Sequence, residues 1–101
     1  MSIYFGDGSA TQTYAGVASA GQYWRSVSRS ANTWYQNTQG HPIQMGVGLQ
    51  RNSSVYVGPS TSSYVTVVSN GGDHSEEMNC PIVPVNYYYR FTSVRTYAEF
   101  Y

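Results

Sequence analysis

A two-residue alternation of apolar with small or polar side chains runs through residues 43–49 of the chain. A β-strand needs this period when one face packs on a core and the other meets water or a polar partner. Residues 51–54 interrupt the alternation and residues 55–57 resume it, which predicts an antiparallel hairpin with a short polar turn. Gly46 and Gly48 fall on the outward face of the first strand, where we expect a neighbouring subunit to approach closely.

Strand signals continue along the rest of the chain, and no window shows a helical period with caps. We expect Trp24 to anchor the first strand in the core, residues 63–68 to form a buried β-branched strand, and residues 86–101 to end the chain in an aromatic hairpin. Cys80 lies in an apolar alternation, as a small inert core residue would. Seven or eight short strands separated by Gly, Ser and Asn turns predict one all-β, jelly-roll-like antiparallel sandwich over residues 22–101.

Residues 1–21 differ in composition, because Ala, Gly, Ser, Thr and Gln dominate them. Such a segment cannot form a core alone, so we expect a short N-terminal arm that a partner orders. The chain starts without a basic and apolar leader and contains no membrane-length apolar segment, so neither a signal peptide nor a membrane partner is expected.

The 101 residues carry little charge: 10 % are charged and the formal net charge is zero, against about 25 % charged in an ordinary domain. Without a basic run the chain lacks the usual footprint of a nucleic-acid-binding protein. A weakly charged surface is poorly protected against association. This favours burial of part of the surface against other copies of the chain.

The titratable residues give weak signals for catalysis. Four titratable residues lie within five positions: Asp73, His74, Glu76 and Glu77. Their spacing fits neither a calcium-binding loop nor a pair of zinc ligands. We therefore interpret the segment as a solvated loop and expect no metal or cofactor. A glycosidase needs two carboxylates flanking a sugar, which Glu99 would supply only if folding brought it to this loop. No serine elbow or catalytic triad context occurs, so we expect no enzymatic activity.

A binding surface is better supported than an active site. Saccharides are held by aromatic faces together with planar hydrogen-bonding side chains, and two turns supply such polar groups. The residues expected to form the receptor loops are Arg51, Asn52, Ser53, Asn70, Asp73, His74, Glu76 and Glu77. The rings that this surface would use are Trp34, Tyr35, Tyr56 and residues 87–89. The alternative is that these rings pack between strands or between subunits.

Several segments resemble the compact β domain at the C-terminal tips of bacteriophage tail fibres and related virion proteins. The similarity rests on residues 24–27, 35–44, 56–58, 82–84 and 87–89, on Glu99 near the end, and on a leader-like segment over residues 3–9. The chain departs from the family pattern in starting without a fibre shaft and in having Tyr97 and Phe100 where a terminal Trp is frequent.

The resemblance implies a homotrimeric, non-enzymatic adhesin of the virion that contacts a host cell-surface glycan. It further implies that the N-terminal arm, with Tyr4 and Phe5 as anchors, attaches the domain to other virion proteins. The domain would be a fibre tip or a small spike. A capsid- or baseplate-bound decoration protein with only virion partners remains the alternative.

Overall fold

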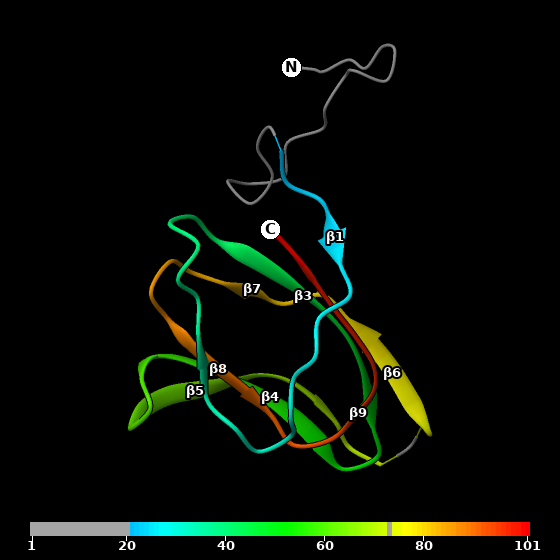
Figure 1. Cartoon of the computed structure of the whole chain (residues 1–101). Coiled ribbons are helices and arrows are strands. Elements are labelled where there is room, and N and C mark those ends of the chain that lie inside the picture. The colour runs from blue at the N-terminus through cyan, green and yellow to red at the C-terminus, as the bar shows by residue number, and fades with distance from the viewer. Residues whose placement is uncertain (1–20, 73) are drawn as a thin grey trace, which may run out of the picture.

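The structure is a computed structural model that describes residues 21–72 and 74–101. These residues form β-strands and no helix, and the strands make two antiparallel sheets packed against each other (Figure 1). The strands are β1 (Trp24–Arg25), β2 (Tyr35–Gln36), β3 (Ile43–Gln50), β4 (Ser53–Ser60), β5 (Ser63–Asn70), β6 (Glu76–Asn79), β7 (Ile82–Val83), β8 (Tyr88–Phe91) and β9 (Val94–Phe100). The predicted all-β sandwich is confirmed, whereas the expected arm lies outside the described residues except for Gly21.

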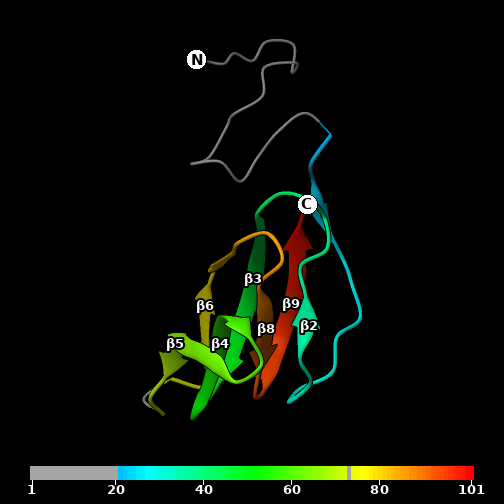
Figure 2. The ribbon, with the colours of Figure 1, turned by 90° about the vertical axis from the view of Figure 1, so that its left-hand side faces the viewer.

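The first sheet has the strand order β1-β9-β3-β6, with β7 also paired to β3, and the second sheet has the order β2-β8-β4-β5. Trp24 of β1 lies opposite Phe100 of β9. The beginning of the described chain and the C-terminus therefore lie at the same end of the sandwich (Figure 2). Residues 21–72 and 74–101 contain no helix that is long and apolar enough to cross a membrane.

The core lies between the sheets and follows from the alternation in β3. The four apolar residues of β3 are at most 1 % exposed. They face inward-pointing residues of β4 and β8 in the second sheet and lie beside Val83 of β7 in their own sheet. The buried cluster consists of Ile43, Met45, Val47, Leu49, Val55, Val57, Val83, Tyr89 and Phe91. Burying each side chain of this size contributes about 1.5–3 kcal/mol, so this cluster is the main source of cohesion between the sheets.

Both predicted hairpins are wrong, because their strands belong to different sheets. β3 pairs with β9, β6 and β7, while β4 pairs with β5 and β8. Arg51 and Asn52 form a corner that carries the chain from one sheet to the other, and Asn52 has a φ of 57°, in the left-handed region that Asn tolerates. A second corner at residues 92–93 joins β8 to β9.

The two corners lie side by side. The Gln50 amide donates to the Ser93 carbonyl (3.3 Å), and the Thr92 amide donates to the Ser54 carbonyl (3.1 Å). The antiparallel pairing of β3 with β9 therefore continues into that of β4 with β8. The two strand pairs are one antiparallel ribbon folded over at its middle, and its two halves supply the centre of each sheet.

Trp24 is not a core anchor, since 47 % of its surface is exposed. It lies on the outer face of the first sheet, with its ring centroid 5.2 Å from that of Phe100. A Cβ on Gly46 would come within 3.1 Å of the Trp24 ring, and a Cβ on Gly48 would overlap the Glu76 carboxylate. The close approach expected on this face is thus made by side chains of the same chain, and a second subunit is not needed to explain the glycines.

Two further burial predictions are wrong. β5 forms as predicted but is the edge strand of the second sheet, with Val65 64 % and Val67 39 % exposed. The β-branched run predicts an extended backbone, and burial depends on the neighbours that the run receives. Cys80 is exposed between β6 and β7, and the alternation around it places Met78 (62 % exposed) and Ile82 (43 % exposed) on the outer face of the first sheet.

Candidate functional site

The first predicted receptor loop is the corner between β3 and β4. Arg51 and Asn52 are exposed, and the Arg51 guanidinium donates to the Gly72 carbonyl at 3.4 Å. Ser53 is only 2 % exposed, and its hydroxyl donates back to the Arg51 carbonyl at 3.4 Å. Ser53 therefore holds the corner, and Arg51 and Asn52 are the residues of this loop that a ligand can reach.

The second predicted loop meets the first through Asn70, which is 2 % exposed. Its side-chain amide donates to the Leu49 carbonyl (3.1 Å) and the His74 carbonyl (3.0 Å), and its oxygen accepts from the Gly72 amide (3.0 Å). The Asn70 side chain makes these three hydrogen bonds within the protein, so Asn70 is a structural link between the loop and the end of β3.

The rest of the predicted loop is shorter than expected. Glu76 and Glu77 belong to β6, where both are half-buried, and the Glu76 carboxylate accepts a hydrogen bond from the Thr96 hydroxyl at 2.9 Å. His74 is exposed. Asp73, like the expected anchors Tyr4 and Phe5, lies outside the described residues. Of the predicted loop residues, Arg51, Asn52 and His74 are thus the ones that the structure leaves open to a partner.

The outer face of the second sheet carries a different set of residues, which we call the aromatic face: Trp34, Tyr56, Tyr64 and Arg90. Each comes from a separate strand or from the residue just before it. Alternation in β4 and β8 sends Val55, Val57, Tyr89 and Phe91 into the core, and therefore sends Tyr56 and Arg90 to the opposite side.

The Tyr64 ring of the aromatic face contacts the other two rings. The Tyr64 ring centroid is 5.0 Å from that of Trp34, with the rings tilted by 57°, and 5.5 Å from that of Tyr56 in an edge-on arrangement. The Arg90 guanidinium carbon lies 5.1 Å from the Trp34 centroid and 4.9 Å from the Tyr56 centroid. These distances are those of aromatic pairs and cation–π contacts.

The position of Tyr64 depends on Gly58 of β4. A Cβ on Gly58 would overlap the Ser63 carbonyl and the Tyr64 backbone, so β5 passes over this glycine at a distance that no other residue allows. Tyr64 remains 44 % exposed, and it also borders a cleft of about 270 Å³ at the end of the β4–β5 hairpin. The cleft is lined by Val57, Gly58, Pro59, Ser63, Tyr64, Val65 and Tyr87.

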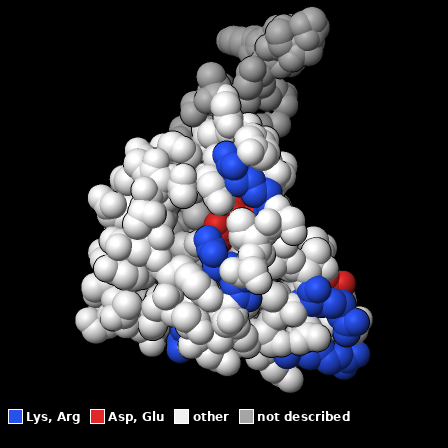
Figure 3. All heavy atoms as spheres, viewed as in Figure 1, with Lys and Arg blue, Asp and Glu red and all other residues white. Residues whose placement is uncertain are grey.

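The charge on the aromatic face is carried by Arg90 alone. No other residue within β2, β4, β5 or β8 is charged. The Nε atom of Arg90 is buried and makes no hydrogen bond to any described residue. In the view of Figure 3, arginine atoms reach the surface in separate groups with few acidic atoms among them. The aromatic face is therefore a set of rings with one positive charge between them.

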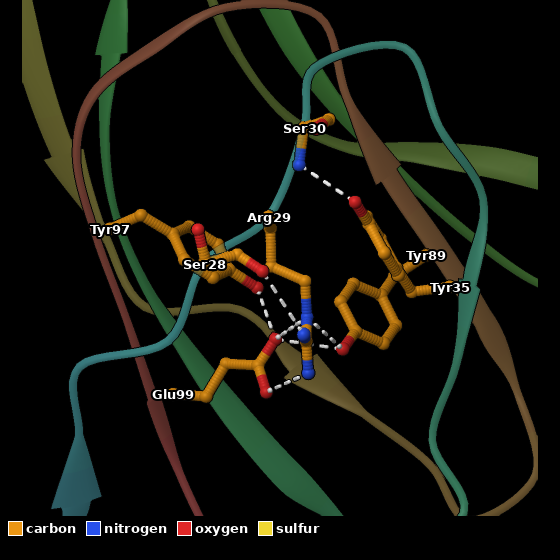
Figure 4. A network of polar contacts seen from close by, with 7 residues as sticks. All are labelled: Ser28, Arg29, Ser30, Tyr35, Tyr89, Tyr97 and Glu99. Carbon is orange, nitrogen blue, oxygen red and sulfur yellow. Dashed lines mark hydrogen bonds and ion pairs between the residues drawn. The ribbon is translucent and has the colours of Figure 1, made fainter.

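A buried polar cluster lies elsewhere, where the segment joining β1 to β2 crosses the edge of the sandwich (Figure 4). Glu99 is 1 % exposed, and Arg29 donates to its two oxygens at 3.1 and 3.2 Å. The Tyr89 and Tyr97 hydroxyls donate to the same carboxylate at 2.7 and 2.6 Å. The Arg29 guanidinium also lies over the Tyr35 ring, 4.9 Å from its centroid.

The cluster shifts the proton affinity of its members. Burial, the hydrogen bond to Glu99 and the negative charge of Glu99 raise the pKa of both Tyr89 and Tyr97 above the usual range. Burial acts to lower the pKa of Arg29, but its hydrogen bond to Tyr89 and the charges around it leave that pKa raised. With four donors on a carboxylate closed off from solvent, the cluster ties the crossing segment to the sandwich and leaves no room for a substrate at Glu99.

Sequence reasoning named Trp34 and Tyr56 as rings of a binding surface but missed Tyr64 and Arg90. The alternation in residues 87–91 places Arg90 opposite the buried Tyr89 and Phe91, which was a readable signal for its outward direction. Nothing in the sequence shows that four strands bring these residues together. The described residues contain no group of three or more His, Cys, Asp or Glu side chains that would hold a metal ion.

Comparison of the chain with protein-family models, with curated proteins and with solved structures yields no match.

Proposed function

We propose that this protein is a non-enzymatic binding protein that recognises a saccharide of a host cell surface through its aromatic face. The observation that carries the proposal is that Tyr64 and Arg90 each contact both Trp34 and Tyr56 on one exposed sheet face. The apolar faces of sugar rings stack on aromatic side chains, and their hydroxyls bond to planar polar groups. The half-exposed Tyr64 is the ring most available to a ligand.

The proposed setting is the surface or tail of a phage particle, where the protein acts as a homotrimeric fibre tip or spike. The motif resemblance supports this setting, and the low proportion of charged residues, 10 %, supports association between copies. Three weak sites on one particle bind together with far greater avidity than one site alone. Secondary contacts would come from the two hydrogen-bonded loops beside β3, through their exposed residues Arg51, Asn52 and His74.

A second candidate function is a capsid- or baseplate-bound decoration protein that binds only virion proteins. It is favoured by the outer face of the first sheet, where Trp24 (47 %), Met78 (62 %) and Ile82 (43 %) expose apolar surface. Apolar patches of this kind are typical of protein interfaces. These three apolar residues lie on the opposite side of the sandwich from the aromatic face, because they belong to the first sheet.

The two functions are separated by a pair of tryptophan variants, because the chain has two tryptophans, one on each outer face. On a glycan array, Trp34→Ala is expected to abolish binding and Trp24→Ala to retain it. If wild-type protein binds no glycan but binds purified capsid or tail tightly, and Trp24→Ala abolishes that binding, the decoration function replaces ours. Circular dichroism of both variants verifies that each is folded.

A further inference from the structure

We infer that the saccharide bound by the aromatic face is acidic, and that its carboxylate pairs with the guanidinium of Arg90. This inference rests on the proposed function, since it names the class of sugar that the same face takes. It follows from the unusual position of one positive charge, which has aromatic neighbours but no acidic one among residues 21–72 and 74–101.

Arg90 is only partly accessible, and its Nε atom is fully enclosed without a hydrogen-bond partner among the described residues. The rings of Trp34 and Tyr56 flank its guanidinium at 5.1 and 4.9 Å. Taking a cation out of water without a partner is costly, and cation–π contacts recover only part of that cost. A ligand that brings a negative charge to this position would recover the rest.

The part of the chain that the structure describes does not bring that charge. The described acidic residues, Glu76, Glu77 and Glu99, all lie on β6 and β9 of the first sheet. Glu99 is already paired with Arg29, in the ion pair that the described residues form. The strands of the second sheet contain no carboxylate, so none of the described residues supplies a counter-charge to Arg90, and a ligand can supply one.

The other arginines do not share this situation. Arg51 and Arg95 are exposed at the end of the sandwich where the two corners lie, so water solvates their charge. Arg25 donates to the Tyr101 carbonyl (2.9 Å) and the Tyr23 hydroxyl (2.7 Å). Arg90 alone combines a restricted environment, flanking rings and the absence of a hydrogen bond within the described chain.

A sugar ring with a carboxylate satisfies both parts of the site. Its ring can lie against Tyr64, which is exposed and touches both Trp34 and Tyr56, while the planar carboxylate accepts two parallel hydrogen bonds from the guanidinium. Thr66 lies opposite Tyr56 in the ladder and is exposed, so a hydroxyl group is available beside the rings. A neutral sugar would leave the Arg90 charge without a partner.

The test compares carboxylated oligosaccharides with their own methyl esters, which keep the sugar ring and lose the charge. The full chain is applied to an array that carries each acid beside its ester, and sulfated and unmodified neutral oligosaccharides complete the panel. We expect the wild type to prefer the acid over the ester by about tenfold or more, the effect of one charge-assisted hydrogen bond. Raising the salt concentration should weaken binding of the acid and leave binding of the ester unchanged.

Arg90→Met has a side chain of similar length without charge, and it should lose the preference for the acid while it still binds the ester. Arg95→Met is the matched control, because Arg95 is exposed on β9 of the other sheet, and it should keep the preference. Equal binding of acid and ester by the wild type would overturn this inference and leave saccharide binding intact. Binding of sulfated sugars alone would also overturn it, and no binding to any sugar would overturn the proposed function as well.

The acid-to-ester ratio and its salt dependence are measured on the wild type. The inference therefore stays testable even if Arg90→Met does not fold.

Discussion

Replacing Arg29 by Met should strongly destabilise the fold, because it leaves the Glu99 carboxylate charged and enclosed. Glu99 is 1 % exposed, whereas the Arg29 side chain is 26 % exposed. Removing one partner of a fully buried ion pair costs about 3–5 kcal/mol. Partial exposure of Arg29 and the two remaining tyrosine hydrogen bonds reduce this, so we expect a loss of about 2–3 kcal/mol in the free energy of unfolding. For a domain of this size, that loss lowers the melting temperature by about 8–24 °C.

The assay is urea unfolding followed by tryptophan fluorescence, with the midpoint and slope compared between variants. A second variant, Arg29→Met combined with Glu99→Gln, removes the uncompensated charge while it keeps a polar group for the tyrosines. We expect the double variant to be more stable than Arg29→Met alone, which a double-mutant cycle quantifies. A loss below about 0.5 kcal/mol for Arg29→Met, the range of ordinary surface changes, or a double variant no more stable than the single one, would refute this reasoning.

Three further predictions concern the tyrosines, the core and the loop link. The pKa of Tyr89 and of Tyr97 is raised, chiefly by burial, so the stability that they contribute is complete below about pH 10 and is lost as the pH rises further. In a tyrosinate absorbance titration, both side chains should ionise only on unfolding. Full ionisation of all 11 tyrosines in the folded protein would contradict this. Leu49→Ala should cost about 2–5 kcal/mol and Val65→Ala at the sheet edge less than about 0.5 kcal/mol, so similar urea midpoints for the two variants would argue against the edge position of β5. Asn70→Ala should cost about 1–3 kcal/mol, because it removes three hydrogen bonds within the protein; an unchanged urea midpoint would show that they are not needed.

The sequence identified the class of fold and its main core strand, because alternation is a local property. The inward residues of β3 are buried as the pattern predicts. The same alternation does not indicate which strands pair with each other. A two-residue turn after Gln50 suits a hairpin and a corner equally well, since the apolar residues of β3 and β4 face the core in either arrangement. The folded ribbon is decided by the pairing of β3 with β9, some fifty residues away along the chain.

The candidate site depends on the same kind of distant pairing. Trp34 and Tyr64 meet only because β2 and β5 belong to one sheet, and neither residue stands out in its own segment. The polar loops stood out because polar residues cluster there, yet Ser53 and Asn70 use their polar groups to hold the loops together. The role of Arg29 at Glu99 was also unreadable, because 70 positions separate the two residues.

Saccharide binding by the aromatic face can be tested directly by nuclear magnetic resonance. The two tryptophans of the chain give two indole N–H signals, one from Trp34 on the aromatic face and one from Trp24 on the outer face of the first sheet. During titration with a carboxylated oligosaccharide that binds on the array, the Trp34 signal should shift in a saturable manner while the Trp24 signal stays in place. A shift of the Trp24 signal alone, or saturable binding that moves neither signal, would contradict binding at the aromatic face.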